Sequence, residues 1–263
     1  LIERSGTAGD SAAGSSARVE VGKRPIQSLS ADDSSSSGLP TVVVNTYSDS
    51  LSIVDLDEGR LLHEISLGPQ RRLKAAERGE ALFHDSRLSH DGWLSCQSCH
   101  TDGHTNGLLA DTFGDGDWGA PKRVLPLGGV AYTDRWAWGG QMQELTDQVR
   151  KSLLTTMLSA SVDDANVNDL VAYLQTLLPP PALSPEAETP AERSQLARGK
   201  TLFLNHGCQH CHVPPLTYTS SDSYDVGLED ENGRKKFNPP SLRGVGHGKA
   251  FLHDNRAQSL ESV

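Results

Sequence analysis

The sequence has few of the residues that build large hydrophobic cores. Only 5% of its 263 residues are aromatic, 36% are apolar, and two are methionine. A chain of this length has room for about two domains. The composition therefore favours small domains with modest cores over one large core.

Basic residues and long apolar runs are also scarce. The chain has 24 Lys and Arg against 34 Asp and Glu, a formal net charge of -10 at pH 7. This acidic balance argues against nucleic acid and anionic membranes as partners, while it serves solubility and would suit a basic protein partner. No stretch is long and apolar enough to span a bilayer, and no signal peptide is visible. Because the chain starts at Leu1 and stops at Val263 inside an apparent element, we expect a fragment, so the missing signal carries no weight.

Cysteine is limited to four residues, and all of them fall in two short motifs. The motifs read C-x-x-C-H, the attachment pattern of c-type haem: Cys96, Cys99 and His100 in the first, and Cys208, Cys211 and His212 in the second. In such a motif the cysteines form thioethers with the haem vinyl groups, and the histidine is the proximal iron ligand. The sequence thus predicts two covalently attached c-type haems, with His100 and His212 as iron ligands.

Other chemistry fits the same residues less fully. Paired C-x-x-C motifs also bind structural zinc, and a C-x-x-C pair can be a redox dithiol. Neither alternative needs a histidine directly after each second cysteine. Covalent c-haem is made outside the energy-transducing membrane, so the haem interpretation predicts a periplasmic or cell-surface protein.

The N-terminal part changes character near residue 40. Residues 1–40 are rich in Ser, Gly, Ala and Asp and predict a loop or a disordered segment. Three strands are then expected, at 41–45, 51–55 and 61–65, separated by turns. The segment 41–70 resembles one blade of a YVTN-type β-propeller. A single blade cannot bury both faces, so either other blades precede Leu1 or this is a small sheet docked on the cytochrome part, and we favour the truncated propeller.

The rest of the chain predicts a mainly α fold of two tandem haem domains. Helices are expected over 72–83, 141–158 and 163–178, and a Pro-rich linker over 179–194. The first haem domain spans 71–178 and the second, truncated, spans 195–263. An internal repeat supports this division, because residues 77–83 match 197–203 and residues 127–130 match 242–245. Leu145 and Leu260 match at the offset of the second pair.

The repeat resembles the bacterial di-haem cytochrome c peroxidase/MauG family. The residues that carry this resemblance are Arg78-Gly-x-x-Leu-Phe83, Asp85-x-Arg-Leu-Ser89, Leu94 to His100, Pro239 to Val245, and Phe251-Leu-His-Asp254. The resemblance covers about residues 71–263. It implies two cytochrome c-like domains with a calcium ion between them, one haem that transfers electrons and another that meets hydrogen peroxide. It also implies that Trp138 lies between the haems.

The chain departs from the family pattern at two positions of the first haem domain. The family's distal histidine is replaced by Asp115, and a carboxylate is a poor ligand for a low-spin haem. The family's catalytic glutamate falls near Leu158, so the acid/base residue for O–O cleavage is missing there. The second haem's distal ligand is expected beyond Val263.

Several further residues have two interpretations each. His253 is expected to order a loop or a haem propionate rather than bind iron, and His104 to be an exposed loop residue. Met142 and Met157 are expected in the core rather than as iron ligands. Four acidic residues are expected in a solvated loop, although oxygen ligands also suit calcium: Asp222, Asp225, Glu229 and Asp230.

The sequence thus favours a di-haem oxidoreductase of the peroxidase/MauG type. Its partners would be a small redox protein as electron donor and hydrogen peroxide as substrate. The alternative is a non-catalytic electron-transfer cytochrome with a propeller as docking module. A zinc protein is the third class, and it predicts a colourless product.

Overall fold

The chain forms two compact units, residues 1–73 and 74–263. The computed structural model describes residues 19–22, 25–29, 40–69, 72–113, 115–181 and 189–263. Each unit has its own cluster of buried apolar side chains. About 33% of the described residues are helical, and a small β segment lies at the N-terminal end.

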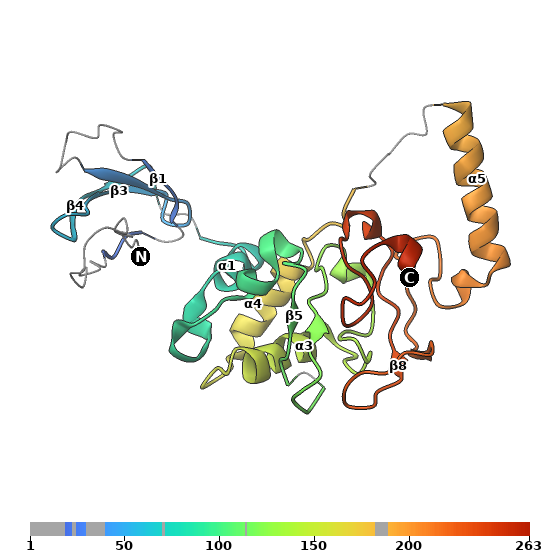
Figure 1. Cartoon of the computed structure of the whole chain (residues 1–263). Helices are drawn as coiled ribbons and strands as arrows, with labels where there is room; N and C mark the ends of the chain where they lie inside the picture. The colour runs from blue at the N-terminus through green and yellow to red at the C-terminus, as the bar shows by residue number, and fades with distance from the viewer. Residues whose placement is uncertain (1–18, 23–24, 30–39, 70–71, 114, 182–188) are drawn as a thin grey trace, which may run out of the picture. The chain divides into compact units, whose positions relative to one another are not determined.

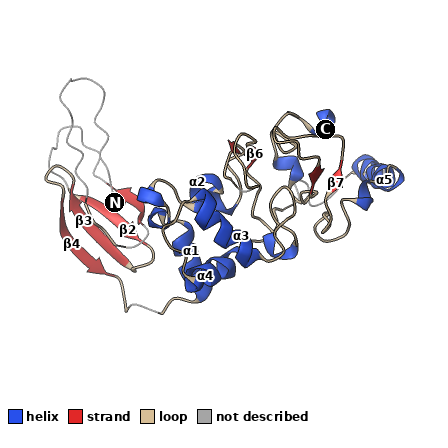
Figure 2. Cartoon of the chain, turned by 90° about the horizontal axis from the view of Figure 1, so that it is seen from below, coloured by secondary structure: helices blue, strands red, loops and turns tan. Residues whose placement is uncertain are grey.

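The first unit is built on a four-stranded antiparallel sheet, shown as strands in Figure 2. Its strands in spatial order are β1 (Pro25–Leu29), β2 (Thr41–Asn45), β3 (Ser50–Asp55) and β4 (Arg60–Ser66). Val43 and Val54 are fully buried on one face, as strand alternation requires. The three predicted strands are confirmed, but the expected loop is wrong at 25–29, where β1 pairs with β2. Membership of a propeller stays a prediction.

The regular structure of the second unit is mainly helical, with two short hairpins (Figure 1). Its helices are α1 (Ala75–Phe83), α2 (Cys96–Cys99), α3 (Leu145–Lys151), α4 (Asp164–Leu174) and α5 (Pro190–Asn205). The hairpins pair β5 (Leu109–Ala110) with β6 (Lys122–Arg123), and β7 (Tyr224–Asp225) with β8 (Lys236–Phe237). The predicted helix over 141–158 is shorter than expected, because α3 passes into a π-helix at Ser152–Thr156.

The core of this unit lies where α1 meets α4, side by side in both views. Phe83, Val167 and Leu170 are almost completely buried there. Gly79 permits the close approach, because a Cβ on it would clash with the Asp169 carbonyl group and lie 2.8 Å from Tyr173 Cβ. The absence of a side chain at Gly79 therefore allows α1 and α4 to pack this closely.

Helix α5 starts inside the stretch that the sequence predicts as a linker. Thr189 caps it, since its Oγ1 accepts a hydrogen bond from the Glu192 amide at 3.2 Å, while Glu192 returns a bond to the Thr189 amide at 2.9 Å. Pro190 is favourable in the first turn, where its missing N–H costs nothing. The predicted linker is therefore wrong from residue 190 onwards. Fifteen of the sixteen residues of α5 are exposed, and Phe203 is half-buried.

The internal repeat seen in the sequence is also present in the backbone. Gly129 and Gly244 both adopt left-handed angles, φ 83° and 71°, and each precedes a single 3-10 turn. An isolated bridge follows at the same spacing in each copy: Trp136 with Met142 in one, and Phe251 with Ala257 in the other. Residues 74–181 and 189–263, called the first and second halves below, are thus built alike in this region.

Within the described ranges, no helix combines the length and the apolar character needed to cross a bilayer.

Candidate functional site

A cavity of about 740 Å³ lies in the second unit and is lined by both halves. Cys96, Cys99 and His100 of the first motif lie on its wall, as do Cys211 and His212 of the second. Cys208 is exposed and lies outside this lining. The two motifs, far apart in the sequence, therefore open into one shared space.

Both motif histidines are held in the same way. His100 Nδ1 is 3.0 Å from the Leu125 carbonyl oxygen, and His212 Nδ1 is 2.9 Å from the Tyr218 carbonyl oxygen. A carbonyl only accepts, so each Nδ1 carries the proton and each Nε2 has a free lone pair. Burial also lowers the pKa of His100, which favours the neutral ring. This is the tautomer that an iron-binding histidine requires.

The first cysteine pair does not have the character of a redox dithiol. Burial raises the pKa of the Cys96 thiol to about 12 and also raises the pKa of Cys99. Reactive dithiols have a lowered pKa instead, because the thiolate is the nucleophile. Among the described residues, no three or more His, Cys, Asp or Glu side chains gather as a metal-binding group.

Several buried polar atoms on the cavity wall lack a partner. They are Trp136 Nε1, Gln148 Oε1 and both ring nitrogens of His253. Each such group costs free energy unless something in the cavity binds it. The volume, the apolar wall, the paired motifs and the free donors, Trp136 Nε1 and one ring nitrogen of His253, fit haem with its carboxylate groups.

The two halves meet through a reciprocal pair of hydrogen bonds. The Arg123 amide donates to the His253 carbonyl oxygen at 2.6 Å, and the Asn238 amide donates to the Trp138 carbonyl oxygen at 2.8 Å. Trp138 and His253 occupy equivalent places in the repeat, and their rings meet edge to face with centroids 6.3 Å apart. The Arg123 guanidinium lies over the Trp138 ring, 5.6 Å from its centroid. Trp138, the predicted bridging residue, thus lies on the cavity wall at the junction of the halves.

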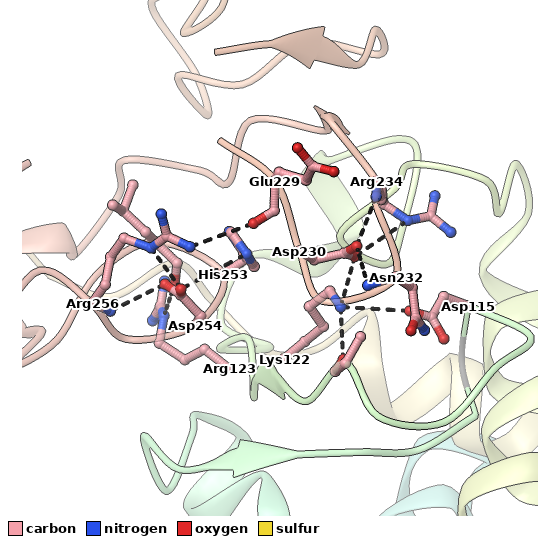
Figure 3. Close-up of polar contacts among 12 residues, drawn as sticks. Asp115, Lys122, Arg123, Glu229, Asp230, Asn232, Arg234, His253, Asp254 and Arg256 are labelled. Carbon is pink, nitrogen blue, oxygen red and sulfur yellow. Dashed lines mark hydrogen bonds and ion pairs between the residues drawn. The ribbon is translucent and has the colours of Figure 1, made fainter. Parts of the chain in front are cut away.

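A buried carboxylate next to this junction corrects one prediction. Asp230 was expected in a solvated loop, but its side chain is fully buried and forms an ion pair with Lys122, whose Nζ is 2.9 Å from Asp230 Oδ2. Figure 3 shows Lys122 extending between Asp230 and Asp115, whose carboxylate is 3.5 Å from Nζ. Burial opposes ionisation of Asp230, but Lys122 and the amides of Arg234 and Asn232 outweigh it, so the carboxyl pKa is lowered.

These residues do not fit a calcium ion. Lys122 already supplies the positive charge that Asp230 needs. The other acidic candidates, Asp222, Asp225 and Glu229, are exposed, and the described residues contain no cluster of metal-binding side chains. The calcium ion implied by the resemblance therefore has no carboxylate site in this part of the chain.

The two departures from the family pattern are visible on and near the wall. Asp115 lines the cavity, where it faces Lys122. Leu158 is 48% exposed and lies outside the cavity lining, so this position supplies no carboxylate to the cavity wall. Asp111 and Asp115 are the only carboxylates among the described lining residues.

The prediction for His104 is wrong, the prediction for Met157 is confirmed, and Gln148 was not predicted. His104 was expected to be exposed, but it is half-buried and lines the cavity. Met157 is buried with its sulfur 3.9 Å from Cys96 Sγ, which confirms a core methionine. Gln148 was missed, although its place on α3 beside the π-helix is a signal, since π-helices are common at functional sites.

The comparisons with known proteins identify the first half directly. Residues 74–177 match the family model described as di-haem cytochrome c peroxidase. The chain is also 28% identical over 242 residues to the methylamine utilization protein MauG of Methylorubrum extorquens. The chain is therefore similar to the di-haem cytochrome c peroxidase/MauG family, whose model matches its first half. Its match to MauG covers 70% of this chain and 66% of MauG, just under two thirds of that relative's length.

More distant members and structures agree with the family fold. The cytochrome c551 peroxidase of Nitrosomonas europaea is 24% identical over 241 residues, which cover 72% of this chain and 71% of the relative. A hydrazine synthase structure from Kuenenia stuttgartiensis superposes with TM-score 0.62 at 22% identity, over 74% of this chain and 78% of that one. A MauG-like protein associated with microbial copper homeostasis gives TM-score 0.54 at 20% identity, over 71% and 72%. These two likenesses concern the fold alone.

Proposed function

We propose that the chain is a di-haem c-type cytochrome oxidoreductase that passes electrons from a donor protein through one haem to hydrogen peroxide at the other. The observation that carries this proposal is the shared cavity, into which two C-x-x-C-H motifs open. Similarity to the peroxidase/MauG family supports the redox assignment.

The motif residues have defined roles in this proposal. Cys96 and Cys99 hold one haem and Cys208 and Cys211 the other, while His100 and His212 bind the irons. Leu125 and Tyr218 fix the two imidazoles through their carbonyl groups, so each ring presents Nε2. When bound, the haems supply the electron storage and the iron site that peroxide needs.

Trp138 is the residue we assign to electron passage between the halves. Its ring lines the cavity, and its Nε1–H donates to the Arg123 carbonyl oxygen at 2.8 Å, which fixes the ring plane. Reduction of peroxide to water also consumes protons, and we assign their delivery to Asp111 and Asp115. The exposed outer surface would receive the donor, and the haem chemistry places the protein in the periplasm or at the cell surface.

The test uses the chain matured in a host that attaches c-haem. We expect a pyridine haemochrome assay to give two haems per chain and EPR to show one high-spin and one low-spin ferric signal. We further expect peroxide-dependent oxidation of a reduced cytochrome. Trp138→Phe should slow that turnover, whereas Trp118→Phe should not, because Trp118 is 56% exposed and lies off the cavity lining. A colourless protein would refute the proposal.

A non-catalytic electron-transfer cytochrome is the second candidate. The observation that favours it is the absence of a carboxylate at Leu158, which leaves only Asp111 and Asp115 on the described cavity wall. Two stable low-spin haems without peroxide turnover would select this function.

A further inference from the structure

His253 is a buried imidazole whose ring nitrogens have no partner. Its side chain is 1% exposed, it lines the cavity, and neither Nδ1 nor Nε2 makes a hydrogen bond to any described residue. The nearest charged atom, Asp254 Oδ2, is 4.0 Å from Nε2, which is too long for a hydrogen bond. Asp254 instead accepts from Arg256 Nε at 2.6 Å. The imidazole is therefore available to a ligand in the cavity.

The ring is nevertheless held firmly in place. Phe237 stacks on it with centroids 4.4 Å apart at 17°, and Trp138 contacts it edge to face. The Arg123 amide fixes its carbonyl group. A side chain that is packed on its faces and free at its nitrogens is preorganised to bind a polar group.

The internal repeat supplies a comparison within the same molecule. Trp138, at the equivalent place in the first half, satisfies its ring N–H with the Arg123 carbonyl oxygen of its own half. His253 makes no such bond to Asn238, the residue equivalent to Arg123. The ring N–H of His253 in the second half is therefore free to donate, whereas the ring N–H of Trp138 in the first half is already hydrogen-bonded.

The surroundings of His253 favour an anion as the ligand. Lys122, Arg123 and Arg256 lie around it in Figure 3, and Lys122 and Arg123 also line the cavity. Asp230 and Asp254 are already paired with Lys122 and Arg256 respectively. Arg123 has no carboxylate partner among the described residues, so an acceptor carboxylate entering the cavity would gain a hydrogen bond from the imidazole together with the uncompensated charge of Arg123.

We propose that His253 donates a hydrogen bond to a haem propionate and thereby raises the reduction potential of that haem. The proposal rests on the proposed function, since the propionate belongs to one of the two haems. A propionate that is hydrogen-bonded places less negative charge near the iron, and hydrogen bonding of this kind tunes haem potentials.

The experiment compares variants of the haem-loaded full chain by spectroelectrochemistry and EPR. His253→Phe keeps the stacking on Phe237 but removes the donor, while His253→Gln retains a donor. His90→Phe is the control, because His90 is exposed and lies off the cavity. We expect H253F to lower the potential of one haem, changing its reduced-to-oxidised ratio at fixed potential by about threefold or more. H253Q and H90F should stay close to the parent, and the spin states should not change.

Two outcomes would overturn the proposal, and neither concerns haem content. Unchanged potentials in H253F would show that His253 makes no bond to a propionate, and loss of a low-spin signal would make it an iron ligand instead. If H253F fails to mature, resonance Raman of the unsubstituted protein gives the answer. The propionate bending bands should then include a hydrogen-bonded one, and only free-propionate bands would refute the proposal. Failure of the proposed function would appear separately, as absence of haem from the parent chain.

Discussion

At the scale of single residues, the ion pair between Lys122 and Asp230 compensates a buried negative charge next to the cavity. Asp230 comes from the second half and Lys122 from the first, so their contact at 2.9 Å joins both. A buried carboxylate is tolerated only when its charge is compensated and its oxygens are hydrogen-bonded. The ammonium group of Lys122 supplies the compensating positive charge. In an oxygen-lined pocket, a divalent cation would have to supply it.

Lys122→Met should therefore destabilise the protein strongly. It leaves the buried Asp230 charge with only Arg234, whose Nε is 3.8 Å from Asp230 Oδ2, and loss of one partner of a buried pair costs about 3–5 kcal/mol. Chemical unfolding of the haem-loaded chain would measure this loss. The matched control is Lys235→Met, because Lys235 pairs with Glu229 at the surface, where both side chains are more than half exposed. That change should cost about 1 kcal/mol or less.

A chelator distinguishes this pair from a metal site. EGTA should leave the unfolding midpoint of the parent chain unchanged, since Lys122 already neutralises Asp230. A midpoint that falls with EGTA and recovers with calcium would contradict this account.

At the scale of elements, the sequence predicted the features that depend on neighbouring residues, such as strands and haem motifs, but not the contacts between distant loops. The strands at 41–45 and 51–55 were predictable from short runs rich in Val and Ile bounded by turns, and the haem motifs from spacing alone. The start of α5 was missed because five nearby prolines suggested a linker, while the Thr189–Glu192 capping box outweighed them. The pairing of Lys122 with Asp230 was not predictable, because it depends on how two distant loops fold together.

Two equivalent glycines provide a matched test of helix packing. Gly79 of α1 and Gly199 of α5 occupy the same place in the repeated segment, but only Gly79 faces a neighbouring backbone. Gly79→Ala should cost about 1–3 kcal/mol, because the added methyl group forces α1 away from α4. Gly199→Ala meets nothing within 4 Å and should stabilise its helix by about 0.5–1 kcal/mol.

Thermal unfolding of both variants would check this difference. Equal effects of the two substitutions would show that the close contact of α1 with α4 contributes no constraint. Arg78 strengthens that contact, since its guanidinium bonds both Asp169 carboxylate oxygens at 2.6 Å.

At the scale of the whole second unit, the two halves form a pseudosymmetric pair. Each half donates one backbone hydrogen bond to the loop of the other, from Arg123 and from Asn238. Since the bonds are reciprocal, neither loop is complete in the absence of the other half. The cavity is consequently a property of the pair rather than of either half.

Hydrogen exchange can test whether the halves open together. The amides of Arg123 and Asn238 should exchange with the same opening free energy, because separating the halves breaks both bonds at once. The Val130 amide, which bonds Leu127 inside one turn, is the control and should exchange independently. Slow exchange at Arg123 beside fast exchange at Asn238 would show that the junction opens one bond at a time.

The reciprocal junction also bears on the order in which the protein matures. A chain exported from its N-terminal end exposes Cys96, Cys99 and His100 outside the membrane well before Asn238 and His253 arrive there. During that interval the Trp138 loop has no opposite loop to bind, and the cavity lacks one of its walls. The first haem can therefore enter from the open side, and the second half then closes over it as export ends. Attachment at the first motif before the second would follow from the geometry of the fold itself.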